Sequence, residues 1–344
     1  MATTQSEVDS VAVDGVPGAP LLEVDDLFVE FRTRDGVAKV LNGVSYRLDA
    51  GETLAVLGES GSGKSVTAQT IMGILDMPPG VITGGAVRYH GVDLLKVSAR
   101  RRREVRGSGI AMIFQDALSA LNPVFTVGFQ IEEQLRLRRG MSRRDARKRA
   151  VELLDLVRIP NPAGRVRQYP HEFSGGMRQR AMIAMSLALD PEVLIADEPT
   201  TALDVTVQAQ IMDLLKDIQV ERNMGLILIT HDLGVVAEVA DRIAVMYAGR
   251  IVEQSDARSL YRRPGHPYTR GLLDSLPRLD LKGTELTTIK GLPPSLLRIP
   301  SGCPFHPRCP RAQDICEAEV PPQHRPAPGR LSACHFAEEL INGE

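Results

Sequence analysis

The segment "GESGSGKS", residues Gly58 to Ser65, matches the pattern G-x-x-x-x-G-K-[ST]. A strand-like apolar run, Thr53 to Leu57, precedes it, and a helix-like run, Val66 to Leu75, follows it. A glycine-rich turn between a strand and a helix lets backbone N–H groups surround phosphate, and this context separates a phosphate-binding loop from a chance glycine-rich turn. The pattern therefore predicts a strand, a phosphate-binding loop and a helix here.

Two side chains of this loop have predictable roles. Lys64 is expected to reach the β- and γ-phosphates of a nucleotide, and Ser65 Oγ is expected to ligate Mg²⁺. The backbone that would wrap the phosphates comes from Gly58, Glu59, Ser60, Gly61, Ser62 and Gly63. The loop thus predicts a nucleotide and Mg²⁺ as ligands.

From Leu21 onward, short apolar runs alternate with longer helix-patterned stretches. This alternation is typical of an α/β sheet with helices on its faces. Gly58, Gln115, Asp197 and His231 each directly follow an apolar run. Because ligands of such sheets bind beyond the carboxyl ends of the strands, we expect these residues to contribute to one site.

Two carboxylates end the run "VLIADEPT". Asp197 is suited to hold Mg²⁺ through water, and Glu198 to orient the attacking water. His231, at the end of "LILITHD", would contact the γ-phosphate, although a satisfied surface or core histidine is the alternative. An Asp-Glu pair or a Gln after a strand is ordinarily only a solvated strand end. The phosphate-binding loop upstream is what favours a catalytic role for Glu198, His231 and Gln115.

The stretch from Asn122 to Phe173 has a wholly helical pattern and predicts an inserted helical subdomain. Ser142 is a plausible N-cap, with Asp145 at the third helical position. An apolar stripe at three- and four-residue spacing follows, formed by Ala146, Ala150, Leu153, Leu154 and Val157.

Length and charge restrict the possible classes of protein. A chain of 344 residues with 43% apolar content can bury a substantial core. Its net charge of -2 gives no overall basic footprint, so nucleic acid is not an expected partner. Residues 1–20 predict a disordered lead-in and not a signal peptide, since acidic residues stand where a positive segment would be. No 18 apolar residues run uninterrupted, so membrane association is expected only through other subunits.

Two basic runs, Arg100 to Arg106 and Arg136 to Arg149, stand out from this balance. They could meet anionic headgroups or RNA. A solvated helix face is the favoured interpretation because Glu and Asp balance the charge overall.

A second glycine turn lies in "EFSGGMRQR", Glu172 to Arg180. Its Ser-Gly-Gly runs into a helix-like segment, an arrangement that presents backbone N–H groups to phosphate. The phosphate-binding loop, Gln115, "SGGMRQR", "VLIADEPT", "TALD" (Thr201 to Asp204) and His231 together resemble the complete motif set of ABC-transporter ATPase domains. This resemblance implies a P-loop NTPase fold of the ABC type: an α/β, RecA-like core sheet, an antiparallel β subdomain and the inserted helical subdomain.

The resemblance also implies site roles. ATP would be sandwiched in a head-to-tail dimer, and the signature of one subunit would close on ATP held by the partner's P-loop. The signature residues here are Ser174, Gly175, Gly176, Met177, Arg178 and Gln179. Asp204 lies in the implied D-loop, Phe31 would stack on adenine, and Gln115 would ligate Mg²⁺ and link to the membrane subunits.

Longer stretches of the sequence resemble a narrower group. The segments "HPYTRGLLDSLP" and "GLPPSLLRIPSGCPFHPRCP" are similar to the ATPases of dipeptide and oligopeptide permeases. The implied protein is an ATPase on the cytoplasmic face of the membrane. Its implied partners are two transmembrane permease subunits, an extracytoplasmic solute-binding protein and a second ATPase, either a copy of this chain or, as the family favours, a distinct homologue. Nickel complexes or oligosaccharides remain alternative solutes. A soluble ABC ATPase acting on ribosomes or DNA and a non-catalytic regulatory module are less favoured, because long coiled-coil arms and a second ATPase domain are absent and Glu198 and His231 are intact.

We expect an ATPase domain over residues 21–264, with its helical subdomain at about 122–173, and a small cysteine-containing module over residues 265–344. The module's cysteines, separated by five, six and seventeen residues, lack the close pairs of structural zinc sites. Disulfides are improbable inside the cell. A [4Fe-4S] cluster is the favoured interpretation, supported by the same resemblance, with zinc and unliganded thiols as alternatives. The four residues are Cys303, Cys309, Cys316 and Cys334.

Overall fold

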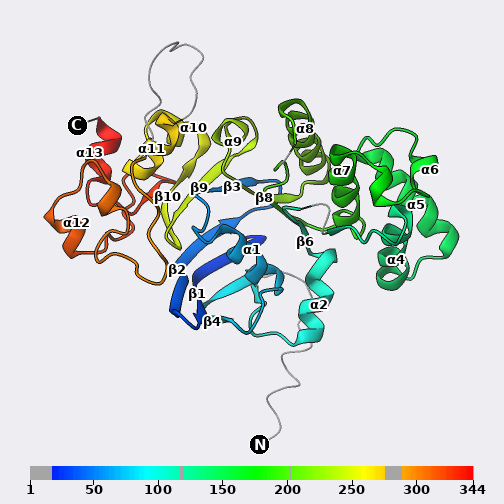
Figure 1. The fold of residues 1–344 in the computed structure, drawn as a ribbon, viewed down its shortest axis with the longest axis horizontal. Helices are drawn as coiled ribbons and strands as arrows, with labels where there is room; N and C mark the ends of the chain where they lie inside the picture. The colour runs from blue at the N-terminus through cyan, green and yellow to red at the C-terminus, as the bar shows by residue number, and fades with distance from the viewer. Residues whose placement is uncertain (1–17, 117–119, 202, 276–288, 344) are drawn as a thin grey trace, which may run out of the picture. The chain divides into compact units, whose positions relative to one another are not determined.

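The computed structural model describes residues 18–116, 120–201, 203–275 and 289–343 (Figure 1). Most of the predicted lead-in, residues 1–20, lies outside them. Two compact units are present: one contains Val97–Leu228, and the other contains Ala12–Lys96 together with Ile229–Glu344. We call them the helical unit and the P-loop unit.

A four-stranded antiparallel sheet forms part of the P-loop unit, with strand order β2-β1-β4-β5. Its strands are β1 (Leu22–Thr33), β2 (Gly36–Leu48), β4 (Gly80–Tyr89) and β5 (Val92–Asp93). Along β1 the buried residues Leu22 and Val24 alternate with more exposed ones, and the pairing register then shifts before the buried Leu27 and Val29. This irregularity keeps apolar side chains buried on both sides of it.

The strand that precedes the phosphate-binding loop is β3 (Thr53–Leu57). It pairs in parallel with β9 (Arg242–Tyr247), β9 pairs antiparallel with β10 (Arg250–Asp256), and β10 with β11 (Leu331–Ser332). All five residues of β3 are buried, which explains its continuous apolar sequence. The helices of this unit are α1 (Lys64–Met72), α9 (Leu233–Val239), α10 (Ala257–Arg262), α11 (Pro267–Asp274), η2 (His306–Arg308), α12 (Asp314–Ala318) and α13 (Ala337–Asn342).

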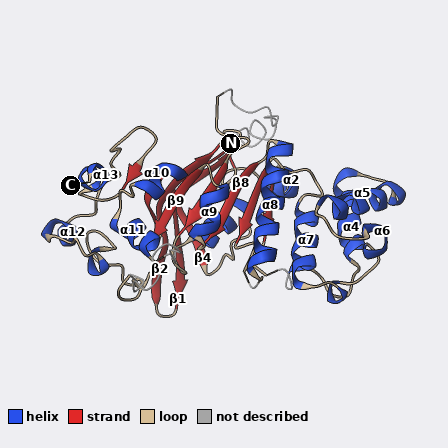
Figure 2. Cartoon of the chain, turned by 90° about the horizontal axis from the view of Figure 1, so that it is seen from above, coloured by secondary structure: helices blue, strands red, loops and turns tan. Residues whose placement is uncertain are grey.

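In the helical unit, β6 (Ile110–Ile113) pairs in parallel with β7 (Val193–Asp197). Helices α4, α5, α6 and α7 lie together in Figures 1 and 2. Of these, α4, α5 and α6 fall within residues 122–173, the range expected for the helical subdomain, and α7 begins beyond it. Among its described residues, the helices of this unit are α2 (Ala99–Ser108), α4 (Val127–Arg139), α5 (Arg143–Leu156), α6 (Pro162–Arg165), η1 (Pro170–Glu172), α7 (Gly175–Ser186) and α8 (Val205–Arg222). Strand β8 (Gly225–Thr230) contains the boundary between the two units.

Helix α5 begins as its sequence predicts. Ser142 is the N-cap, and its Oγ accepts a hydrogen bond from the Asp145 backbone N–H at 3.1 Å. The predicted apolar stripe is fully buried: Ala146, Ala150, Leu153, Leu154 and Val157 are each 0% exposed. The cap and the stripe together fix where the helix starts and which side faces the core.

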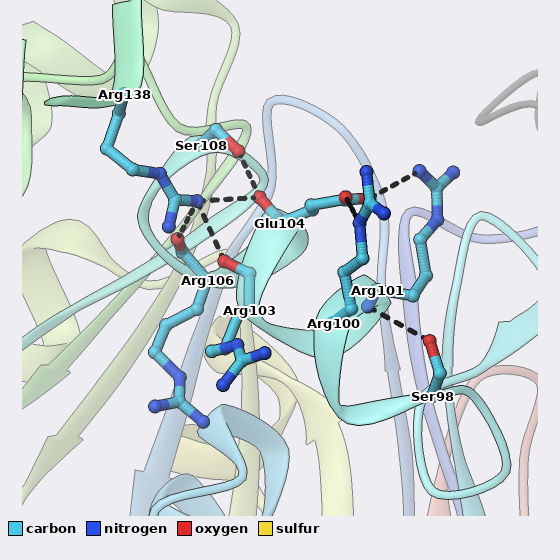
Figure 3. A network of polar contacts seen from close by, with 8 residues as sticks. All are labelled: Ser98, Arg100, Arg101, Arg103, Glu104, Arg106, Ser108 and Arg138. Atoms are coloured by element: carbon cyan, nitrogen blue, oxygen red, sulfur yellow. Dashed lines mark hydrogen bonds and ion pairs between the residues drawn. The ribbon is translucent and has the colours of Figure 1, made fainter.

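The two basic runs make many contacts within the helical unit (Figure 3). On α2, Arg100 and Arg101 form ion pairs with Glu104, each at 3.2 Å. Arg138 of α4 departs from a solvated helix face, because its Nη2 donates to the backbone oxygens of Arg103, Glu104 and Arg106 at 2.7, 3.1 and 3.1 Å. A guanidinium on the last carbonyls of a helix stabilises its negative end. At least this arginine has a structural role.

Candidate functional site

Glycine is required at two positions of the phosphate-binding loop. Gly58 has φ +152°, and a Cβ there would lie 2.3 Å from the Met246 carbonyl oxygen. Gly63 has φ +105°, and a Cβ there would lie 2.7 Å from Leu41 Cδ2. At these two positions the loop is therefore packed against its surroundings so closely that only glycine fits.

Lys64 begins α1 and is 6% exposed. Its Nζ donates to the Gly58 and Glu59 carbonyl oxygens at 2.7 and 2.9 Å and to Ser62 Oγ at 3.4 Å. The ammonium group is thus held at the mouth of the loop by neutral oxygens, which phosphate oxygens can replace with a charge-assisted contact. Ser65 follows in the first turn of α1, where the helix end favours anions.

Residues far away in the sequence also hold this loop. The Glu59 carboxylate receives two hydrogen bonds from Arg308, and the Glu59 backbone N–H donates to Tyr268 Oη. Arg308 is 249 residues from Glu59, and Tyr268 is 209 residues from it. Both residues lie in the stretches similar to dipeptide and oligopeptide permease ATPases, but nothing in those stretches indicated a contact with the loop.

In the helical unit, Asp197 is the last residue of β7 and is buried. Glu198 follows with φ +46°, a left-handed conformation that is uncommon and strained for a residue with a side chain. Its Oε2 accepts hydrogen bonds from Gln115 Nε2 at 2.8 Å and from Thr201 Oγ1 at 2.9 Å. The structure therefore brings the predicted Gln115 and Glu198 together, and it adds Thr201, which the sequence did not indicate.

Ser174 is the N-cap of α7, and its Oγ accepts from the Met177 backbone N–H at 3.3 Å. Gly175 and Gly176 therefore lie in the first turn, where backbone N–H groups lack partners within the helix. A Cβ on Gly176 would lie 2.9 Å from Val207 Cγ1 of α8, so a larger residue would push these helices apart.

Three other signature residues serve α7 itself or its surroundings. Arg178 Nε donates to the Pro170 carbonyl oxygen at 2.8 Å, which ties the helix to the preceding turn. Gln179 and Met177 continue the helix, and Gln179 is buried. Asp204 is the N-cap of α8 and accepts from the Val207 N–H at 3.0 Å.

The remaining predicted residues lie in the P-loop unit. His231 directly follows β8 and is exposed. Phe31 is half-buried on β1, where its ring lies 3.1 Å from the position a Cβ on Gly80 would take. The structure thus locates both residues and leaves their assigned contacts with nucleotide as predictions.

All four cysteines line one cavity of about 20 Å³, which is room for about one water molecule. None of them forms a disulfide, and all but Cys309 are buried. Burial raises the pKa of Cys303 to about 11 and that of Cys334 to about 12. Among the described residues, no group of three or more His, Cys, Asp or Glu side chains is arranged to hold a single metal ion.

Comparison with known structures places the fold in one class. The dimeric MJ0796, titled a bacterial ABC transporter cassette, matches with a TM-score of 0.62 at 29% identity, over 69% of this chain and 99% of that one. CbiO1 from Clostridium perfringens matches with a TM-score of 0.60 at 28% identity, over 71% of this chain and 91% of that one. The ABC transporter family model matches residues 41–201. The fold and the phosphate-binding loop define an ABC transporter ATPase, which hydrolyses ATP to drive transport.

Closer relatives narrow the family. The oligopeptide transport ATP-binding protein OppD of Salmonella typhimurium is 52% identical over 94% of this chain and 96% of its own length. The dipeptide transport ATP-binding protein DppD of Bacillus subtilis is 52% identical over 88% of this chain and 90% of its own. A model of the C-terminal region of oligopeptide/dipeptide transporters matches residues 252–316. This chain belongs to the OppD/DppD family of ABC transporter ATP-binding proteins, which confirms the resemblance and the fold class predicted from its motifs.

Proposed function

We propose that this chain is the subunit that binds and hydrolyses ATP to energise uptake of di- and oligopeptides across the cytoplasmic membrane. The observation that carries this proposal is the 52% identity to OppD along 94% of the chain, which includes the region after the ATPase motifs. The proposed partners are two permease subunits, an extracytoplasmic binding protein and a second ATPase of the same class. No helix among the described residues is both long and apolar enough to cross a bilayer.

The transported solute is tested with the assembled complex in proteoliposomes. We expect the peptide-loaded binding protein to stimulate ATP hydrolysis several-fold, because solute binding is coupled to closure of the ATPase pair. A panel of di- and oligopeptides, nickel complexes and oligosaccharides separates the alternatives. Stimulation by a nickel complex or an oligosaccharide, with none by any peptide, would contradict the proposal.

For the ATPase step we assign roles to residues in both units. Lys64 would neutralise the β- and γ-phosphates, Ser65, Asp197 and Gln115 would hold Mg²⁺ directly or through water, and Glu198 would orient the attacking water. His231 would contact the γ-phosphate, and Phe31 would stack on adenine. No covalent intermediate is needed, because charge neutralisation and positioning lower the barrier. The hydrogen bonds from Gln115 and Thr201 to Glu198 support its assignment, since they orient the carboxylate.

The signature would act on nucleotide held by the partner ATPase. Its support is the cap at Ser174, which leaves the amides of Gly175 and Gly176 at a positive helix end. The dimeric MJ0796 and its post-hydrolysis state bound to ADP and Pi show that a similar cassette pairs. We propose that ATP holds the pair closed and that loss of the γ-phosphate releases it. Asp204 at the N-terminus of α8 would lie near the same interface.

Exposed apolar side chains in the helical unit are the proposed docking surface for a permease segment. Phe125 and Phe129 stack with ring centroids 4.8 Å apart and remain 43% and 38% exposed. Val124 is 69% exposed, and Phe114, directly before Gln115, is 42% exposed. Exposed apolar side chains that pack against one another, as Phe125 and Phe129 do, are typical of a surface that binds a partner. Phe114 directly precedes Gln115, whose side chain donates to Glu198, so movement of a permease segment at Phe114 would be relayed to Glu198.

We also propose a [4Fe-4S] cluster on the four cysteines. The support for a cluster is the chemical type of the donors, since all four are thiols that line one cavity, although as described they are not grouped closely enough to hold a metal ion. Metal would replace the thiol protons that burial retains, and the small cavity requires the thiols to move apart on loading. When bound, the cluster would cross-link this region and could exchange one electron.

Anaerobic purification followed by iron and sulfide analysis tests the cluster. We expect about four irons and four sulfides per chain and a brown colour. Cys316→Ser should lose most of this iron, whereas the exposed Arg325→Gln in the same region should retain it. A colourless, iron-free protein would rule out the cluster, and stoichiometric zinc in its place would support the zinc alternative.

A further inference from the structure

The region after α10 makes direct contact with the phosphate-binding loop, within the P-loop unit. We propose that Arg308, with Tyr268, is a positioning residue for this loop and that it controls nucleotide affinity through Glu59. The inference rests on the proposed binding of ATP at the loop. It assigns to the C-terminal region a part in ATP binding that no motif of the ATPase domain carries.

The first contact is a bidentate ion pair between Arg308 and Glu59. Arg308 Nη1 lies 2.6 Å from Glu59 Oε2, and Nη2 lies 2.9 Å from Oε1. The side chain of Arg308 is only 6% exposed and that of Glu59 is 27% exposed, so water screens the pair weakly. The hydrogen bonds that Arg308 donates to the Glu59 carboxylate raise the pKa of Arg308 above its ordinary value, and the guanidinium stays charged. A bidentate pair of this kind fixes the orientation of the Glu59 carboxylate as well as its distance from the guanidinium.

The second contact holds the backbone of the same residue. The Glu59 N–H donates to Tyr268 Oη at 2.9 Å, while its carbonyl oxygen accepts from Lys64 Nζ at 2.9 Å. The N–H, the carbonyl and the side chain of Glu59 are therefore all engaged. Since Glu59 directly follows Gly58, these contacts limit how the loop can open around phosphate.

Arg308 is itself held by aromatic residues. Its Nη1 lies 3.3 Å from Tyr247 Oη, and its guanidinium lies 5.8 Å from the centre of the Tyr247 ring. Phe305 packs against Tyr247 and Tyr268, with ring centroids 5.2 and 5.3 Å apart, and it also lines the cysteine cavity. Arg308 directly precedes Cys309. Packed side chains thus connect the lining of the cysteine cavity to Arg308.

Electrostatics gives the expected direction of the effect. A triphosphate in the loop brings negative charge towards the Glu59 carboxylate, and like charges repel. Arg308 neutralises that carboxylate and holds it in a fixed direction. Removal of the guanidinium leaves a partly buried carboxylate uncompensated beside the ligand, which should weaken nucleotide binding.

The test is a double-mutant cycle on the purified full-length chain, with binding of a fluorescent methylanthraniloyl-ATP as the readout. We expect Arg308→Gln to raise the Kd about tenfold, which corresponds to about 1.4 kcal/mol and is the size of one charge-assisted hydrogen bond. Adding Glu59→Gln should remove most of that increase, because the uncompensated charge is gone. Arg308→Lys keeps the positive charge but cannot form the bidentate pair, so its Kd should lie between those of wild type and Arg308→Gln.

Two controls separate this role from a structural one. Arg325→Gln, an exposed arginine of the same region, should leave the Kd unchanged. Arg308→Gln and the double variant should both unfold well above the assay temperature, so that weak binding by Arg308→Gln alone is not a loss of the fold. If Arg308→Gln does not fold, Arg308→Lys and Tyr268→Phe serve the same test, with a Kd raised several-fold.

The measured Kd values decide whether Arg308 controls nucleotide affinity. An unchanged Kd in Arg308→Gln, or effects of the two substitutions that multiply independently, would overturn the proposal. Lys64→Ala tests the proposed ATP site on which this inference rests, and it should abolish methylanthraniloyl-ATP binding. Wild-type binding by Lys64→Ala would reject the loop as the ATP site, whereas loss of binding there with no effect of Arg308→Gln would reject only the role of Arg308.

Discussion

Replacing Glu198 by Gln is expected to lower ATP hydrolysis by about 100-fold or more, the usual contribution of a group that orients and accepts a proton from the attacking water. The amide has nearly the same shape, so ATP binding should persist. Because hydrolysis is what releases the closed ATPase pair, the variant should accumulate as an ATP-bound dimer. Steady-state phosphate release and size-exclusion chromatography with ATP measure the two effects.

The geometry around Glu198 makes this test specific. Gln115 and Thr201 orient its carboxylate, and its backbone is left-handed at φ +46°. The loss of ATP hydrolysis should therefore be specific to Glu198 and should not follow from removing any one negative charge from the surface. Glu221→Gln, an exposed carboxylate on α8 of the same unit, is the matched control and should hydrolyse ATP at the wild-type rate. Turnover of Glu198→Gln close to that of the control would refute the assigned role.

Ser174→Arg is expected to abolish coupled ATP hydrolysis in the complex while the same chain still binds ATP at Lys64. The arginine removes the cap oxygen that accepts from the Met177 N–H, and it places a bulky cation at the positive end of α7. The bulk of the arginine side chain blocks approach of the partner's phosphates. In a Glu198→Gln background, the ATP-dependent dimer should therefore disappear, whereas methylanthraniloyl-ATP binding by the isolated chain should stay within about twofold.

Ser174→Ala removes the helix cap without adding bulk, so it separates the effect of losing the cap from the effect of obstructing the partner's phosphates. It should cost about 1 kcal/mol of helix stability and leave most of the dimer intact, because no bulk enters the interface. Loss of ATP binding by the isolated Ser174→Arg chain, with its fold retained, would mean that the signature serves its own nucleotide. That result would contradict the proposed two-subunit site.

Local sequence predicted much of the fold. The order of strand, loop and helix around Gly58 to Ser65 was confirmed, although α1 begins at Lys64, two residues earlier than the apolar pattern indicated. The cap at Ser142 and the buried stripe of α5 were also confirmed. In each case the deciding contacts lie within a few residues of one another, so a short segment contains the information.

The candidate site was predictable as a set of residue types, and its contacts were not. The pattern indicated Gln115 and Glu198 separately, but the 2.8 Å contact between them depends on how β6 and β7 pair. The hydrogen bond from Thr201 is local, three residues along the chain from Glu198, yet no residue pattern indicated it. Similarly, the spacing of four cysteines left cluster, zinc and free thiols open, and only the folded chain places all four on one cavity.

The sequence alone determined the class of this protein, because its phosphate-binding loop and strand-end carboxylates use backbone geometry that neighbouring residues specify. Tertiary structure alone decided that Arg308 and Tyr268 hold Glu59 of that loop, across 249 and 209 residues. An arginine pairs with whichever carboxylate the fold brings within about 3 Å, and neither partner carries a local signal of the other. Such a long-range pair forms only after packing has closed the intervening chain, which is why no short pattern could reveal it.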